Sequence, residues 1–247
     1  MVDINSSGQP RRWKLDPPDT SVHTNVVNRT TGAIRYFLAS DAYSTTNTTA
    51  ELNALRASFA QWQAVSGTIL KFEDAGLVTP GVDVNTEDNT NVLYWAKTNL
   101  IVNGGMDNIA NELSATYTSF FSDDNTLAEA DIVFNGVQYS WFTDFNIPTT
   151  AGQFVEGWAL HEIGHFIGLR HSPVGGATMF WNGASGVSLQ SGLSPDELTA
   201  ARWLYAPSSA PSSLARLRGT VTMNGASVFG AVVVAEEIGR ASCRERV

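Results

Sequence analysis

The stretch WALHEIGHFIGLRHSPVGGATMF, residues 158–180, holds three of the four histidines of the chain within eleven positions. On an α-helix, residues four positions apart share one face and lie about 6 Å apart along the axis. His161 and His165 can therefore bind one metal ion. Glu162 stands beside this pair, in the HExxH arrangement in which the glutamate acts as general base.

Zinc in catalytic sites takes about three protein ligands and leaves one position for water. Gly168 can end the helix and reverse the chain, which would bring His171 to the metal as the third ligand. A downstream glutamate is the third ligand in another group of zinc peptidases, and Glu197 is the rival candidate here. Glu197 is already explained as a helix-capping partner of Ser194, so the sequence favours His171.

The composition excludes several classes of protein. A hydrophobic content of 43% and a charged content of 16% indicate a globular chain with room for one sizeable domain in 247 residues. The net charge of −9 argues against nucleic-acid binding, and no apolar run approaches the roughly 20 residues of a membrane span. Cys243 is the only cysteine, so disulfides and a cysteine-rich zinc site are excluded.

Hydrophobic periodicity predicts an α+β domain with three helices. The first helix begins near Thr48, with Glu51 at capping-box spacing, and stops near Gly67. The second begins near Thr150, with Gln153 at the matching position, and runs through His165. The third has a complete start signal in SPDE, residues 194–197. Strands are expected over 33–39, 68–74, 91–96, 113–121 and 130–136.

The expected domains follow from composition and patterning. We expect a polar N-terminal lead-in over 1–28, a catalytic domain over 29–206, a linker over 207–213, a truncated β-module over 214–239 and a non-native tail over 240–247. The β-module alternates around an Asn-Gly turn and looks like the first hairpin of a small β-sandwich. The tail GRASCRER breaks this alternation, and we interpret it as a translated cloning or sequencing leftover.

HEIGHFIGLRH followed by ATMF resembles the metzincin zinc metallopeptidases, whose extended motif ends in a Met-turn. Within that clan the chain is most similar to matrixins of the bacterial type. LSPDELTAARWLY resembles their closing helix, and IRYFL, LRASFAQWQAVSGTILKFED and ADIVFNG resemble their early strand, first helix and mid-sheet strand. The resemblance covers about residues 29–206. Astacins and serralysins usually carry a tyrosine where Trp181 stands, which also favours matrixins.

The resemblance implies a zincin-like fold, with a twisted, mixed and mainly parallel sheet and three main helices. It also implies roles for particular residues. Met179 would be the Met-turn methionine, an apolar floor beneath the zinc, and an extended peptide would pair with the edge strand. The substrate-binding residues implied are Leu113, Ser114, Ala115, Thr116, Phe180 and Trp181.

The chain departs from vertebrate matrixins at their other metal sites. Their second, structural zinc uses histidines where this sequence has Ala115 and Val133, so we expect no second zinc. Family calcium ligands would fall at Asn135 and Gln138, and amides are weaker calcium ligands than carboxylates. A different calcium site could use Asp123, Asp124, Glu129 and Asp131, although a solvated acidic loop is the simpler interpretation.

The sequence thus predicts a monomeric zinc-dependent endopeptidase that acts on protein or peptide substrates. One zinc held by His161, His165 and His171 would activate a water, and Glu162 would take its proton. Two alternatives remain: a catalytically idle metzincin fold used for adhesion, and a zinc hydrolase acting on a non-peptide amide. The chain starts without a signal peptide, but such enzymes are usually exported, so we expect a secreted protein.

Overall fold

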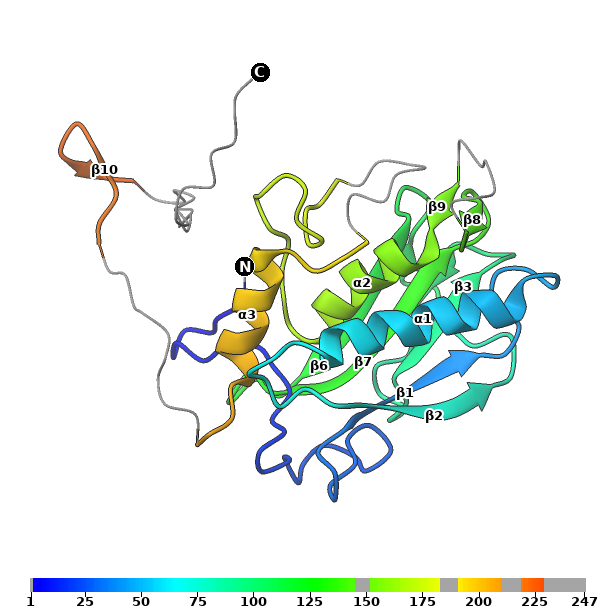
Figure 1. Cartoon of the computed structure of the whole chain (residues 1–247), viewed down its shortest axis with the longest axis horizontal. Coiled ribbons are helices and arrows are strands. Elements are labelled where there is room, and N and C mark those ends of the chain that lie inside the picture. The colour runs from blue at the N-terminus through cyan, green and yellow to red at the C-terminus, as the bar shows by residue number, and fades with distance from the viewer. Residues whose placement is uncertain (1, 145–151, 183–190, 210–218, 229–247) are drawn as a thin grey trace. The chain divides into compact units, whose positions relative to one another are not determined.

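The structure is a computed structural model that describes residues 2–144, 152–182, 191–209 and 219–228 of the chain. Its contacts divide the chain into two compact units, Met1–Pro211 and Ser212–Val247. The site lies in the first unit, which consists of a sheet with helices packed on one face (Figure 1).

The main sheet has five strands in the order β2-β1-β3-β7-β6. All pairings are parallel except that of β6 with β7. This agrees with the mixed, mainly parallel sheet expected from the sequence. β6 stands at one end of the strand order and has a single partner within the sheet. The strands are β1 (Ile34–Ala39), β2 (Phe72–Val78), β3 (Val92–Ala96), β6 (Ser114–Phe120) and β7 (Leu127–Asn135).

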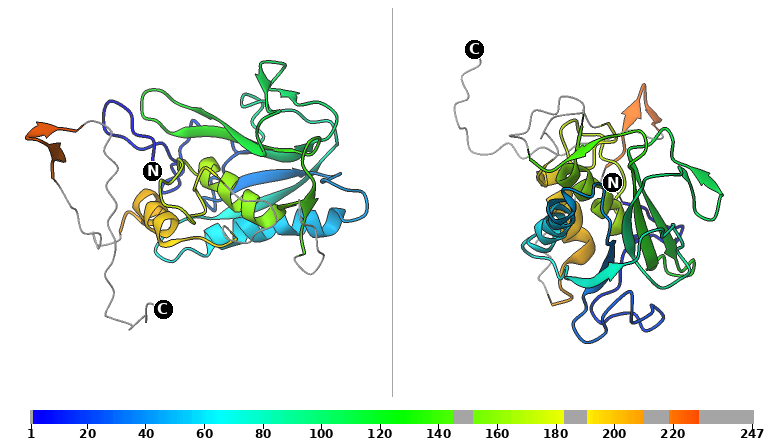
Figure 2. Two further views of the ribbon diagram at one scale, coloured as in Figure 1. Left: turned by 90° about the horizontal axis from the view of Figure 1, so that it is seen from above. Right: turned by 90° about the vertical axis from the view of Figure 1, so that its right-hand side faces the viewer.

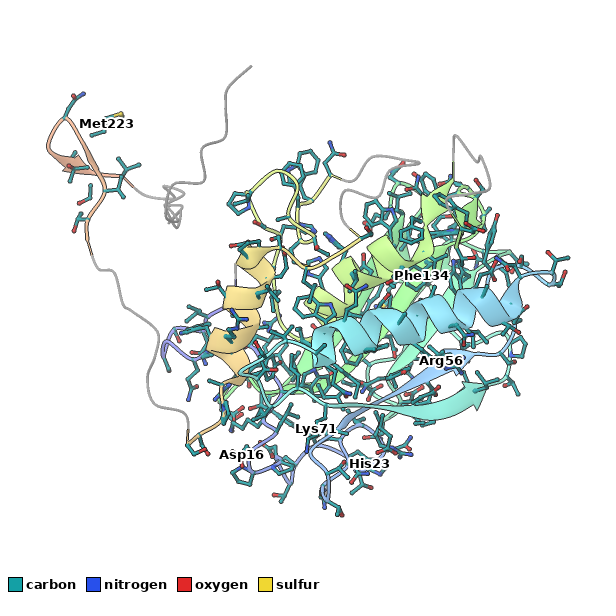
Figure 3. The ribbon with its side chains drawn as sticks, viewed as in Figure 1. Asp16, His23, Arg56, Lys71, Phe134 and Met223 are labelled. Atoms are coloured by element: carbon teal, nitrogen blue, oxygen red, sulfur yellow. The ribbon has the colours of Figure 1, made fainter. Side chains whose placement is uncertain are left out.

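Three helices complete the unit: α1 (Thr48–Gln63), α2 (Val155–Phe166) and α3 (Pro195–Tyr205). α1 and α2 lie side by side on one face of the sheet, as the turned views in Figure 2 also show. Arg56 of α1 pairs with Asp74 of β2 at 2.7 Å, which ties the helix to the edge of the sheet (Figure 3). α2 also contacts β6 and β7, so one side of this helix faces the edge strand β6.

Two helix starts differ from the sequence prediction. Thr48 is already inside α1, and the side chain of Glu51 does not cap the helix but accepts hydrogen bonds from the backbone of Tyr43 and Ser44. α2 begins at Val155 because Gln153 belongs to a short strand and accepts a hydrogen bond from the Trp158 indole at 2.9 Å. Thr150 lies outside the described residues.

The third helix and most strands match the prediction. Ser194 and Glu197 form the complete capping box of α3. Strand β2 starts later than expected, at Phe72, because the backbone of Ile69 is already bonded to the Tyr205 carbonyl at the end of α3. The other four strands overlap their predicted ranges.

The N-terminal lead-in packs into the same core as the helices and the sheet. Trp13, Val26 and Val27 are at most 1% exposed, and Leu15 and Val22 are also buried. The core that they join is built from the buried faces of α1, α2 and the sheet. The lead-in is therefore part of the first unit rather than a polar extension of it.

The remaining strands are short. They are β4 (Ile101–Val102), β5 (Asp107–Asn108), β8 (Trp141–Phe142) and β9 (Gln153–Phe154) in the first unit, and β10 (Thr222–Met223) and β11 (Ala226–Ser227) in the second. β10 and β11 form the hairpin expected around Asn224 and Gly225, both of which have positive φ. The sandwich-like module stays a prediction, and the proposed tail at 240–247 lies outside the described residues. No described helix has the length and apolar character of a membrane span.

Candidate metal centre and active site

Three histidines converge at the end of α2. His161 and His165 project from the helix, and His171 reaches the same point from the turn that follows it. Their rings lie 4.7 to 5.1 Å apart between centroids. One ligand atom from each histidine lies within 4.8 Å of the other two, so the group can hold a metal ion. Among the described residues, no other group of three or more histidine, cysteine or acidic side chains brings its ligand atoms this close together.

Two of the three rings are oriented by backbone carbonyls. His161 Nδ1 lies 2.7 Å from the Thr178 oxygen, and His165 Nδ1 lies 2.8 Å from the Leu169 oxygen. If each Nδ1 carries the proton, each Nε2 is free to bind a metal, which is the usual arrangement for metal-ligating histidine. Burial lowers the pKa of both histidines and thereby favours the neutral form that binds metal.

The chain reverses at Gly168, as the sequence predicts. Its φ of 95° lies in the left-handed region, and its amide donates to the His165 carbonyl at 2.9 Å. A side chain at this position would also collide with the carbonyl oxygen of Arg11. Two constraints therefore require glycine here, the backbone conformation and the close approach of the lead-in.

Met179 packs against helix α2 at Gly164, which lies between the two helical histidines in sequence. It is 1% exposed, and a Cβ at Gly164 would collide with its sulfur. Glu197 holds this methionine in place, because its Oε1 accepts the Met179 amide at 2.9 Å while its Oε2 accepts the Ser194 amide. Both oxygens of Glu197 are thus engaged away from the histidine cluster, and Glu197 is not a member of it.

The Glu162 carboxylate is held by two hydroxyl groups of the edge strand. Ser114 Oγ donates to Oε1 at 2.7 Å, and Thr116 Oγ1 donates to Oε2 at 2.5 Å. Glu162 is only 3% exposed. The candidate base is therefore fixed between helix α2 and strand β6, next to the cluster of histidines.

An open cleft of about 880 Å³ runs between β6 and α2 over the histidines. Of the predicted substrate-binding residues, Leu113, Ser114, Ala115, Thr116 and Trp181 line it, and Trp181 is 65% exposed. Phe180 does not line the cleft and is half-buried.

The sequence patterns did not identify some of the residues that line the cleft. Trp158 lines the cleft, and its ring lies 5.7 Å from that of His161. Its position three residues before His161, on the same helix face, was the available signal. Glu112 also lines the cleft, and burial together with the charge of Glu162 raises its pKa. Asp3 and Arg11 line the cleft too, and no local pattern indicates this.

Among the described residues, the four acidic side chains considered for calcium do not converge on one point as the histidines do. Asp124 pairs with Lys14. Glu129 and Asp131 are buried, and their carboxylates accept backbone amides of the loop 85–92. A solvated acidic loop is therefore not what these two residues form. Burial raises the pKa of each to about 7.

The other two candidate calcium ligands bond to their surroundings. The Asn135 amide donates to the carbonyls of Ile109 and Glu112 and to the side chain of Gln138. His23, the fourth histidine, is exposed on the lead-in and accepts the Asn25 amide (Figure 3).

Three neutral imidazoles, two of them oriented by carbonyls, fit the donor set that zinc prefers in catalytic sites. The buried carboxylate beside them adds a group that can accept a proton. Fold and site together define the class of zinc metallopeptidases.

The comparison with protein families identifies the particular family. The matrixin family model matches residues 28–206, and the chain belongs to this family of zinc metallopeptidases. No match was found among curated proteins. The match begins after the lead-in, so residues 2–27 pack against the family domain without being part of the matched range.

Proposed function

We propose that the chain is a zinc-dependent endopeptidase with His161, His165 and His171 as ligands and Glu162 as general base. The observation that carries the proposal is the convergence of three histidine ligand atoms within 4.8 Å beside a buried carboxylate, in a cleft along an open strand edge. The family match supports the same class of activity.

Bound zinc would supply a Lewis acid that polarises the scissile carbonyl and lowers the pKa of water. Glu162 would accept the proton of the attacking water and then transfer it to the departing amine. Its two oxygens are held by Ser114 and Thr116, so the carboxylate has little freedom to turn away from the reacting atoms. Met179 would serve as the apolar floor of the Met-turn.

The substrate would bind as an added strand along β6. β6 has one sheet partner, β7, and Ser114, Ala115, Thr116 and Thr118 of this strand line the cleft. Main-chain hydrogen bonds would hold the peptide, and side chains would contact the cleft walls. Trp181 is large, is exposed and lines the cleft, and it would cover a substrate side chain. We also propose that the protein acts outside the cell, as matrixins generally do.

The proposal is tested by incubating the purified chain with casein and with a peptide library, with and without a zinc chelator. We expect cleavage that the chelator abolishes and that added zinc restores. An absence of chelator-sensitive cleavage of both substrates would contradict the proposal. Hydrolysis of small amides without cleavage of peptides would favour a hydrolase acting on a non-peptide amide.

Glu162→Ala separates a peptidase from an idle binding fold. The variant should lose about 10²- to 10⁴-fold in kcat, because it lacks the proton acceptor, and should bind zinc as the parent does. Glu156→Ala is the matched control on the same helix, since this carboxylate bonds to Gln61 and does not line the cleft. Equal turnover by Glu162→Ala and the parent would overturn the assigned mechanism.

A further inference from the structure

We infer that residues 2–13 of the lead-in act as a support of the metal site, and that Trp13 and Asp3 position the turn that carries His171. The inference rests on the metal-binding part of the proposed function and does not require peptide hydrolysis. This segment precedes the residues matched by the family model, so the family match assigns it no role.

His171 differs from the other two ligands in what holds it. Its ring has no hydrogen-bond partner among the described residues, and the residue is exposed. The carbonyls of Thr178 and Leu169 orient the other two rings. The position of the His171 ring is therefore set by the backbone of the turn, residues 166–171.

Buried side chains hold the first two carbonyls of this turn. The Trp13 indole donates to the Phe166 oxygen at 2.8 Å, and the Tyr205 hydroxyl donates to the Ile167 oxygen at 2.6 Å. The two side chains belong to one network, because the Trp13 amide donates to the Tyr205 hydroxyl at 3.1 Å. Trp13 and Tyr205 are each 1% exposed, so water does not compete for these bonds.

The next residues of the turn touch the lead-in directly. Gly168 lies against the Arg11 carbonyl, closely enough that no side chain fits between them. Leu169 forms an isolated β-bridge with Val2. The Leu169 carbonyl in turn contacts the ring of His165, so the lead-in also supports the partner of a second ligand.

Asp3 fixes the residue immediately before His171. Its Oδ2 lies 2.8 Å from Arg170 and 3.0 Å from Arg11. One carboxylate thus links the turn to the lead-in, and the pKa of Asp3 is lowered chiefly by the hydrogen bond from Arg170. Contacts from the lead-in or its partner Tyr205 reach each residue from 166 to 170 in this way.

The first test is Trp13→Phe, which keeps an aromatic ring in the core but removes the donor to the Phe166 carbonyl. We expect zinc affinity, measured by competition with a chelator at a temperature where the variant is folded, to fall by about tenfold or more. Trp141→Phe is the matched control, because it removes a buried indole bond to the Asn135 carbonyl, away from the turn. This control should lose stability but keep its zinc affinity.

The second test is Asp3→Asn, which alters no deeply buried group and is expected to fold. Zinc affinity should fall about threefold at low salt and less at high salt, because the ion pairs are partly exposed. Asp19→Asn removes an ion pair with Lys14, elsewhere in the lead-in and away from the turn, and should have no effect on zinc affinity.

Zinc affinities within twofold of the parent in both Trp13→Phe and Asp3→Asn would overturn the inference. If Trp13→Phe does not fold, an unchanged affinity in Asp3→Asn at low salt is sufficient to overturn it. A parent chain that binds zinc but cleaves no peptide would refute the proposed function alone. A parent that cleaves peptides, with zinc affinity unchanged in both variants, would refute this inference alone.

Discussion

His161 and His165 stand on helix α2, whereas His171 stands on the turn that follows it. The helical pair is buried or half-buried, and each ring contacts a backbone carbonyl. His171 is exposed, and its ring has no hydrogen-bond partner in the described part of the chain. One site is thus built from two kinds of ligand, a pair fixed by its own helix and a single ligand fixed by its backbone.

The difference shows which parts of the site are encoded locally. A spacing of four residues on a helix is enough to align His161 with His165. The turn needs a glycine, which is a local feature. It also needs the contacts of Trp13 and Asp3, which are 153 and 167 residues away in sequence from their partners Phe166 and Arg170. The third ligand is therefore the part of the site most sensitive to distant substitutions.

The largest effect should come from removing a ligand of either kind. His161→Ala and His171→Ala should each lower zinc affinity by more than about 100-fold, since even the loss of an outer partner costs 10- to 100-fold. Only His161→Ala should destabilise the metal-free chain, by about 2 kcal/mol, because it leaves the buried Thr178 carbonyl without its partner. Chelator competition and thermal unfolding would measure the two effects. A His171→Ala variant that keeps tight zinc binding would show that the turn does not supply a ligand.

The alignment of His161 with His165 on one helix was predictable from the sequence, as was much of the fold. The HExxH spacing, the turn at Gly168 and the Ser194 capping box depend on residues within a few positions of one another. Four strands also fell within or near their predicted ranges, because each is rich in apolar, aromatic or β-branched residues. These features are local, so a single sequence contains the information that they need.

The errors and omissions all involve partners distant in sequence or a competing local bond. Glu51 has the spacing of a capping residue, but the backbone of Tyr43 and Ser44 takes its carboxylate. Gln153 pairs within a short strand instead of starting α2. The sequence places Trp13 in a polar lead-in and does not reveal its burial, because its partners Phe166 and Tyr205 come from the other end of the domain.

The floor under the helical pair can be disturbed by Gly164→Ala. The added Cβ would collide with the sulfur of Met179, and such overpacking costs about 1–3 kcal/mol of unfolding free energy. The double variant Gly164→Ala with Met179→Ala should recover part of this loss, which a double-mutant cycle would detect. Gly175→Ala is the control, since its Cβ would meet nothing within 4 Å. Full additivity in the cycle would mean that the two residues do not press on each other.

The base on α2 is held by β6, and Thr116→Val tests that contact. Valine keeps the shape of threonine but cannot donate to Glu162, so kcat should fall about tenfold while KM and zinc affinity stay near parent values. Thr116→Ser should restore kcat, because it restores the hydroxyl. Thr118→Val serves as control, because Thr118 lies on the same strand and also lines the cleft but does not donate to the Glu162 carboxylate. A rise in KM without a fall in kcat would instead indicate a role in substrate binding.

The smallest expected effect is at Glu129, a buried carboxylate outside the metal site that can be compared with Glu162. This residue is as buried as Glu162, at 3% exposed, but one of its carboxylate oxygens has no hydrogen-bond partner in the part of the chain that the structure describes. Burial raises its pKa from 4.5 to about 7, so the folded chain binds more protons than the unfolded chain between these values. The unfolding free energy should therefore decrease as pH rises from about 4.5 to 7.

Glu129→Gln stays neutral at every pH and should make this decrease shallower, whereas the proton of Asp131 should preserve part of it. Denaturant unfolding at several pH values between 4.5 and 8 measures the slope. Glu87→Gln, exposed on the same loop, should leave the slope unchanged. Zinc affinity should not change in either variant, because the buried carboxylates hold the loop 85–92 and do not contact the histidines. A steeper slope in Glu129→Gln would mean that Glu129 is ionised in the folded chain at neutral pH.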